Sequence, residues 1–279
     1  MTTLINRHLK IFFKDRVSVF FSLFSVFIII TLYLLFLAKN MTTNLPNFKD
    51  KDIFIFLWMF SGIVAVTTAT TALGALGKLT EDTVSKKSTD FLITHITSRK
   101  LAYSYIYYAL IIGLIFTIIL LIFGYIYTFV KFSVLLTPSF SLIAIIFLST
   151  LMHTLLFYLI VSRLKTLSAF SGFSTIIGTL IGFLAGIYIP IGILPIPIQQ
   201  IITLFPTTQV VVLLRDSLME SVLSPLTSAM PVDSYNELTT TLGIRLQWNE
   251  QLLPFTFSWL YIIGITLFLI FLIQIKNRR

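Results

Sequence analysis

Six long apolar runs divide the sequence, and short polar segments separate them. Each run reaches the roughly 20 residues that a helix needs to cross the hydrocarbon core of a bilayer. The pattern therefore predicts an all-α membrane protein, a single transmembrane domain over residues 1–279 with six transmembrane helices. The predicted spans are 17–38, 53–77, 101–130, 139–162, 170–189 and 254–275.

Composition supports the same class. Hydrophobic residues make up 57% of the chain and charged residues 11%, with a mean hydropathy of +0.96. A soluble domain has about 45–50% apolar and 25% charged residues, and a soluble fold of this size has too little interior to hide the excess. The sequence has no cysteine, which excludes disulfides, iron–sulfur clusters and thiolate metal sites. We expect no metal and no cofactor on the chain itself.

The net charge of +9 is distributed unevenly over the predicted loops. With the N-terminus placed inside, the inner segments hold 14 Lys and Arg against four acids, and the outer segments hold six against seven. Cytoplasmic loops of membrane proteins carry such an excess of basic residues. We therefore expect both termini in the cytoplasm, and membrane topology, not nucleic-acid binding, explains the basic charge.

Residues 2–16 predict an amphipathic helix that does not span. One face is apolar and the opposite face is basic, which is typical of a helix on the cytoplasmic interface beside anionic headgroups. A frayed basic tail is the alternative. The apolar face comprises Leu4, Ile5, Leu9, Phe12 and Phe13, and the polar face Asn6, Arg7, Lys10 and Lys14.

The segment 78–100 joins the second and third predicted spans on the inner side. It is polar and of mixed charge, but an apolar cluster of Phe91, Leu92, Ile93 and Ile96 interrupts it. A plain tether does not need such a cluster, whereas a short helix that docks on another protein does. Packing of the cluster on the membrane surface remains the alternative.

Residues 190–253 form the long outer segment. Pro190, Pro195 and Pro197 break the fifth span repeatedly, while 198–205 is apolar but too short to cross, and we assign Pro190, Pro195 and Pro206 to the outer re-entrant region. This predicts a re-entrant outer helix followed by a small polar cap over 215–250. We expect Trp58 and Trp259 to act as interfacial anchors at outer span ends.

Two spans carry faces of small residues, which let helices approach closely in lipid. In the fifth span this ridge serves either packing within the chain or a subunit interface beside a pathway. In the second span the small residues fit a tight helix interface or a weakly polar cavity. The two sets are Ser174, Gly178, Gly182 and Gly186, and Ser61, Ala65, Thr68, Ala69 and Ala72.

The spans contain little that could perform chemistry. His153 is the one ionisable side chain that we place within a span, and we expect a neutral ring hydrogen-bonded to a hydroxyl, with Thr150 and Thr154 nearby. Gly77-Lys78 lacks the preceding glycine and the following Ser or Thr of a phosphate loop, so no ATP site is predicted. Without a charged pathway, a translocated substrate is expected to be apolar or amphipathic.

Three stretches resemble the membrane subunit of type-2 ATP-binding-cassette (ABC) transporters, the export permeases. NRHLKIFFKDR (6–16) is similar to the entry helix of that family. DFLITHITSRKLAYSY (90–105) is similar to the segment after its coupling helix, with His95 where the family often has proline. GIYIPIGILP (186–195), with FPTT (205–208) and the following Leu214-Arg215, is similar to its outer re-entrant region.

The resemblance implies a bacterial cell-membrane protein in which two permeases, identical or siblings, lie over two separate ABC ATPase subunits. ATP and Mg²⁺ would bind to those ATPases. Spans one, two and five would line the route, and 78–100 would be the coupling segment. The ATPase-contact residues it implies are Glu81, Asp82, Lys86, Lys87, Asp90 and Phe91.

Two functions from different classes follow. The first is an exporter subunit, itself not an enzyme, for a drug, an antimicrobial peptide or a lipid-like molecule. The second is a non-transporting sensor or immunity protein that binds an antimicrobial peptide through its outer cap. A membrane enzyme is disfavoured because the spans show no paired carboxylates and no Ser/His/Asp arrangement.

Overall fold

The structure is a computed structural model that describes residues 1–16, 19–20, 31, 48, 50–94, 96–249 and 251–276. The predicted first span, 17–38, lies outside the described residues except at three positions. The described elements are α1 (Thr2–Lys14), α4 (Lys51–Val84), α5 (Lys87–Ile93), α6 (Ser98–Phe132), α7 (Phe140–Val161), α8 (Leu167–Leu184), the 3₁₀ turn η2 (Ile191–Ile193), α9 (Ile196–Thr203), α10 (Pro206–Ala229), α11 (Val232–Thr241), β1 (Gln247–Trp248), β2 (Gln251–Leu252) and α12 (Phe255–Lys276).

Five of the described helices are long and apolar enough to cross a membrane: α4, α6, α7, α8 and α12. The pair α9 and α10, bent by 85° at its break, makes up to six if it counts as one span. These findings support an all-α, multi-pass membrane protein. Three predicted spans, 101–130, 139–162 and 254–275, agree with their helices at both ends within a few residues, and the second and fifth agree at their first ends.

Two helix ends differ from the prediction. Helix α8 stops at Leu184, not at 189, because Gly186 takes the left-handed backbone (φ +62°) that ends a helix. Helix α4 continues seven residues past 77, to Val84. The i,i+3 and i,i+4 ion pairs of Lys78 with Glu81 and Asp82 support that extension.

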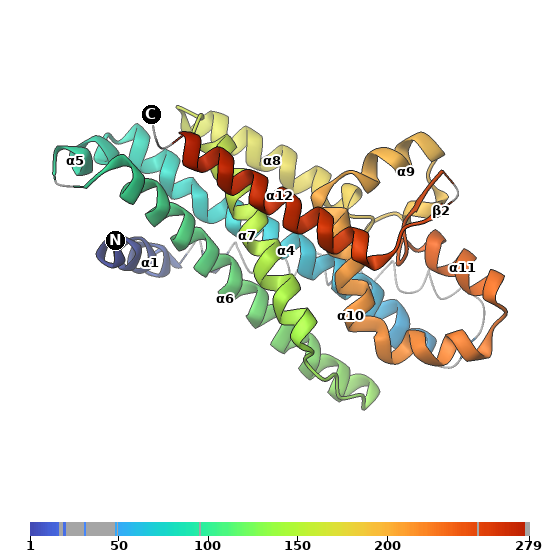
Figure 1. Cartoon of the computed structure of the whole chain (residues 1–279). Helices are drawn as coiled ribbons and strands as arrows, with labels where there is room; N and C mark the ends of the chain where they lie inside the picture. The colour runs from blue at the N-terminus through green and yellow to red at the C-terminus, as the bar shows by residue number, and fades with distance from the viewer. Residues whose placement is uncertain are drawn as a thin grey trace.

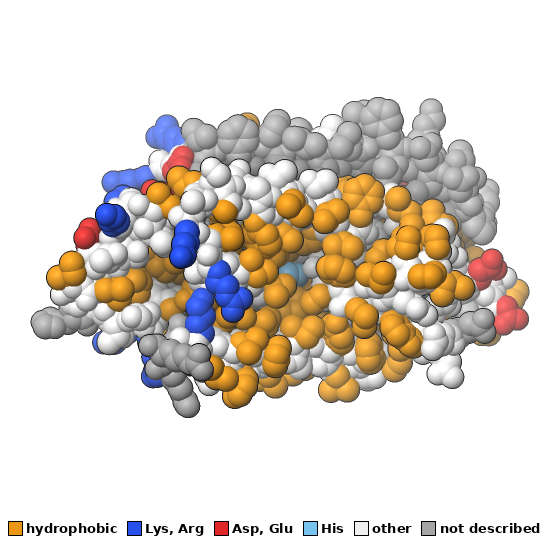
Figure 2. Space-filling model, turned by 90° about the horizontal axis from the view of Figure 1, so that it is seen from above, with side chains coloured by type: hydrophobic (Ala, Val, Ile, Leu, Met, Phe, Trp, Pro, Cys, Tyr) orange, Lys and Arg blue, Asp and Glu red, His pale blue; other side chains and the backbone are white. Residues whose placement is uncertain are grey.

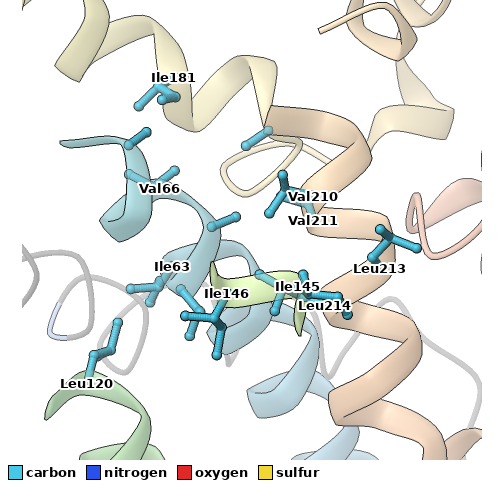
Figure 3. Packing of buried hydrophobic residues seen from close by; sticks show 14 of the residues in the cluster. Ile63, Val66, Leu120, Ile145, Ile146, Ile181, Val210, Val211, Leu213 and Leu214 are labelled. Atoms are coloured by element: carbon cyan, nitrogen blue, oxygen red, sulfur yellow. The ribbon is translucent and has the colours of Figure 1, made fainter. Parts of the chain in front are cut away.

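Helix α4 is the centre of the bundle. It packs against α6, α7, α8 and α10, and 94% of its most apolar 18-residue stretch is buried. Figure 3 shows Ile63 and Val66 of this helix among side chains from α6, α7, α8 and α10. Small residues along α4 permit this close approach, and the hydroxyls of Thr67 and Thr71 donate to the carbonyls of Ile63 and Thr67 in its own preceding turn.

The bundle has two chemically different ends. Helices α1 and α5 and the end of α12 lie together on the left of Figure 1, and α9, α11 and the β1–β2 hairpin lie on the right. Figure 2 shows hydrophobic side chains across the middle of one face, with its Lys and Arg in the left half. We call the first the basic end and the second the cap end.

The cap end differs from the predicted cap. Prolines begin its elements as expected: Pro190 and Pro195 precede η2 and α9, and Pro206 is the first residue of α10. Helix α10, however, runs without interruption from Pro206 to Ala229. The predicted start of the polar cap at 215 is therefore wrong, because that position lies in the middle of a mostly buried helix.

Candidate functional site

The basic end is organised around one buried carboxylate. Asp82, near the end of α4, is fully buried. It accepts a hydrogen bond from the Tyr105 hydroxyl at 2.9 Å and forms ion pairs with Arg7 and Lys78, each at 3.3 Å. A buried carboxylate is stable only with such compensation. The cluster joins α1, α4 and α6, which are far apart in sequence.

Helix α1 docks on α6 through aromatic contacts. The buried His8 ring stacks on Tyr105 with centroids 4.5 Å apart, and its Nε2 lies 3.5 Å from the Ser104 hydroxyl. Phe12 contacts Tyr108 and Phe116 further along α6. Burial, and secondarily the charge of Arg7, lower the pKa of His8 to about 4, so the docked ring is neutral at pH 7.

Helix α5 lies within the predicted coupling segment, on the surface of the bundle. None of its residues is buried, yet Phe91 and the following Ile96 pack on a small core of Leu4, Leu101 and Tyr105. Leu92 and Ile93 are 45% and 82% exposed. In the apolar cluster of 91–96, Phe91 and Ile96 therefore fix α5 to the bundle, whereas Leu92 and Ile93 remain exposed on its surface.

The predicted ATPase-contact residues divide in the same way. Glu81, Lys86, Lys87 and Asp90 are exposed, and Phe91 is half-buried with the Arg7 guanidinium 4.9 Å from its ring centroid. Asp82 is the exception, because its side chain faces inward and its partners belong to this chain. Contact of Asp82 with an ATPase stays a prediction, and in the structure its carboxylate pairs with Arg7 of α1.

A second polar group lies between the spans. The His153 ring is buried, with Nδ1 3.1 Å from the Thr68 hydroxyl and Nε2 3.0 Å from the Thr207 hydroxyl. The expected hydrogen bonding to hydroxyls is confirmed, but Thr150 and Thr154 are not the partners: they donate to backbone carbonyls of their own helix. His153 thus connects α7 with α4 and α10.

The break between α9 and α10 is surrounded by polar side chains that satisfy freed backbone groups. Thr208 donates to the carbonyl of Leu184 at the end of α8, at 2.6 Å. Gln209 donates to the carbonyl of Thr203 and accepts from Ser258 of α12, at 2.6 and 2.7 Å. A bent helix can lie at membrane depth only when its broken hydrogen bonds find such partners.

The cap end is organised around a buried cation without an acid. Arg215 is fully buried, and its guanidinium donates to the carbonyls of Gly186, Leu242 and Gly243, each at 2.9 Å. It also lies 4.5 Å from the ring centroid of Trp58. We call this group the carbonyl cage. It fixes the ends of α8 and α11 to α4 and α10.

Trp58 belongs to the carbonyl cage and is not an interfacial anchor. Its side chain is fully buried, and its indole Nε1 donates to the carbonyl of Leu242 at 2.7 Å. The prediction of a lipid-interface position for this tryptophan is therefore wrong. Trp259, on α12, is half-buried at the cap end.

The small-residue faces have different surroundings. The set from the second span, Ser61, Ala65, Thr68, Ala69 and Ala72, is fully buried inside the chain. In the α8 ridge, Gly182 is packed so closely that an added Cβ would lie 2.3 Å from the Tyr188 ring, and Gly186 needs its positive φ. Gly178 faces open space, and Ser174 is half-buried. A subunit interface or pathway at these residues stays a prediction.

Sequence reasoning missed two groups, the partners of Asp82 and the carbonyl cage. The available signal for Arg215 was its position after five apolar residues, VVVLL (210–214), in a segment that continues as a helix. The signal for Asp82 was its i,i+4 spacing from Lys78. No family model matches the chain, and no curated protein or solved structure is similar to it.

Proposed function

We propose that this chain is the membrane-spanning permease subunit of an ATP-driven ABC exporter in a bacterial cell membrane, with both termini in the cytoplasm. A separate ABC ATPase would bind ATP and Mg²⁺, and a second copy or a sibling permease would complete the assembly. The substrate would be a hydrophobic or amphipathic molecule such as a drug, an antimicrobial peptide or a lipid-like compound. The proposal includes a topology of six spans, in which α9 and α10 form the re-entrant outer region.

The observation that carries the proposal is the position of α5. This short helix lies between α4 and α6, the two longest described helices, and projects at the basic end. Its exposed Leu92 and Ile93 stand beside exposed charges, as in the core and rim of a protein interface. Motion of a partner bound there would be transmitted directly to α4, the central helix of the bundle.

The test is co-purification of the tagged full chain with an ABC ATPase from its native membrane, followed by Mg-ATP hydrolysis. The double substitution Leu92→Glu and Ile93→Glu should remove the ATPase, because it places two charges in the centre of the proposed interface. The substitution Val232→Glu is the matched control, since Val232 is 71% exposed on α11 at the cap end. It should leave association unchanged.

Two results would contradict the exporter. One is an ATPase that stays bound to the Leu92/Ile93 variant as well as to the native chain. The other is a native chain that retains no ATPase but binds an antimicrobial peptide at the cap end, which would favour the sensor or immunity protein. Drug or peptide efflux that survives only in the native chain and the Val232→Glu control would support transport.

A further inference from the structure

Helix α1 has a second face that its docking on α6 does not use. Leu4, His8 and Phe12 point toward α6, whereas Thr3, Asn6, Lys10 and Lys14 are exposed and Arg7 stands at the edge between the two faces. The exposed residues recur at helical spacing, so they form one continuous polar strip along the helix.

This strip lines a hollow of about 460 Å³. Its walls include the side chains of Thr3, Asn6, Arg7, Lys10, Ile11 and Lys14. All of these described lining residues belong to α1, and they offer hydroxyl, amide, ammonium and guanidinium donors and no carboxylate. Such a donor set fits a phosphate group.

The cations of the hollow are incompletely neutralised. Within the described ranges, neither Lys10 nor Lys14 forms an ion pair with an acid. Arg7 pairs with Asp82 through Nη1 alone, at 3.3 Å, and its side chain remains 30% exposed on the side of the hollow. A phosphate in the hollow would therefore compete with Asp82 for the guanidinium of Arg7.

The surroundings favour a lipid as the source of the phosphate. Phe13, 48% exposed, follows Phe12 at the end of the same helix, and α6 presents exposed Ile118, Ile119 and Ile122 beyond the region where α1 docks. Basic residues beside exposed apolar side chains are typical of helices at the headgroup level. Anionic headgroups supply the complementary charge.

We infer that the hollow on α1 binds the phosphate headgroup of an anionic phospholipid, and that this headgroup shares Arg7 with Asp82. The inference requires the membrane location of the chain but not its transport function. Because Arg7 also lies over the Phe91 ring at 4.9 Å, headgroup binding would draw one side chain away from both the Asp82 cluster and α5. Anionic lipid would thereby loosen the attachment of α5 to the bundle.

The test is a titration of the purified full chain in neutral detergent with short-chain phosphatidylglycerol, with phosphatidylcholine as the comparison. Phosphatidylglycerol should bind at least about tenfold more tightly. The variant Lys10→Gln/Lys14→Gln should lose about tenfold in that affinity, because each cation near a headgroup contributes measurably. The control Arg163→Gln/Lys165→Gln changes the same charge at exposed positions of the α7–α8 turn and should stay within about twofold.

A second experiment tests whether the headgroup and Asp82 share Arg7. The variant Asp82→Asn should bind phosphatidylglycerol more tightly than the native chain, since Arg7 is released toward the hollow. A thermal melt in phosphatidylcholine checks that this variant is folded, and Lys78→Gln, which keeps the Arg7–Asp82 pair, should not tighten binding. Weaker or unchanged binding in folded Asp82→Asn overturns the sharing.

Two other results overturn the lipid site. In the first, the Lys10/Lys14 variant and the Arg163/Lys165 control lose equal affinity, which would mean that only the total charge matters. In the second, inorganic phosphate at the same concentration binds as tightly as phosphatidylglycerol, which would assign the hollow to a soluble anion.

Discussion

Among the described residues, each end of the bundle buries one charged side chain, and the two ends compensate that charge by different means. Asp82 at the basic end is surrounded by opposite charges and one phenol. Arg215 at the cap end is surrounded by carbonyl dipoles and an indole, and within the described part of the chain it pairs with no carboxylate.

The two sets of partners should respond differently to solution conditions. An ion-pair cluster depends on charge, so protons, salt or a competing anion can change it. The carbonyl cage depends on the positions of two backbone segments, each of which has a glycine at φ +62°. Its acceptors do not titrate. We therefore expect the basic end to respond to conditions and the cap end to stay fixed.

The largest expected effect is the loss of the carbonyl cage. The substitution Arg215→Met should destabilise the chain by roughly 3 kcal/mol, because it leaves the carbonyls of Gly186 and Gly243 buried without donors. The measurement is the unfolding transition in detergent, followed by circular dichroism during titration with a denaturing detergent.

The substitution Arg215→Lys separates geometry from charge. A lysine ammonium is a single point charge and cannot reach the carbonyls on both sides of the cage, so it should recover less than half of the lost stability. Full recovery by lysine would show that any buried cation suffices and that the cap end resembles the basic end after all.

A smaller effect is expected from the ion-pair cluster. The substitution Asp82→Asn should cost about 2 kcal/mol, since asparagine can still accept from Tyr105 but leaves Arg7 and Lys78 without their shared charge. The loss should appear chiefly as faster hydrogen exchange in α1. Glu81→Gln is the control: it removes an exposed partner of Lys78 and should change stability by no more than about 0.5 kcal/mol. Equal effects of the two substitutions would mean that burial of Asp82 contributes nothing.

The membrane-spanning helices could be predicted because their signal is local. A run of apolar residues long enough to span is visible in the sequence itself, and α6, α7 and α12 begin and end close to the predicted positions. The ends of the helices were harder to predict from the sequence. The extension of α4 depends on side-chain pairs, and the early end of α8 depends on the backbone of one glycine.

The buried charges could not be predicted because their partners are distant in sequence. Arg7 and Asp82 are 75 residues apart, and Arg215 and Trp58 are 157 apart. A charged residue is usually exposed, so sequence alone assigns it to a loop. His153 illustrates the same limit: its type of bond was predictable, but its partners come from α4 and α10 and not from its own helix.

A pH response is also expected, and it should be confined to the basic end. Docking on α6 holds the pKa of His8 at about 4, below the ordinary value of 6.5, so an undocked α1 binds a proton that the docked one does not. Docking should therefore weaken as the pH falls from 6.5 toward 4, by at most about 1.4 kcal/mol per pH unit. His8→Phe keeps the ring contact and removes the titrating group, so it should abolish the response.

Spin labels can report this response, because the chain has no native cysteine. A label at Thr3→Cys should become more mobile between pH 6.5 and 4.5, while a label at Ser234→Cys, exposed on α11, should not change. Equal mobility changes at both positions would mean that the whole fold loosens in acid. The contrast between a titratable and a fixed end would then be wrong, since the carbonyl cage would have yielded without a group that titrates in that range.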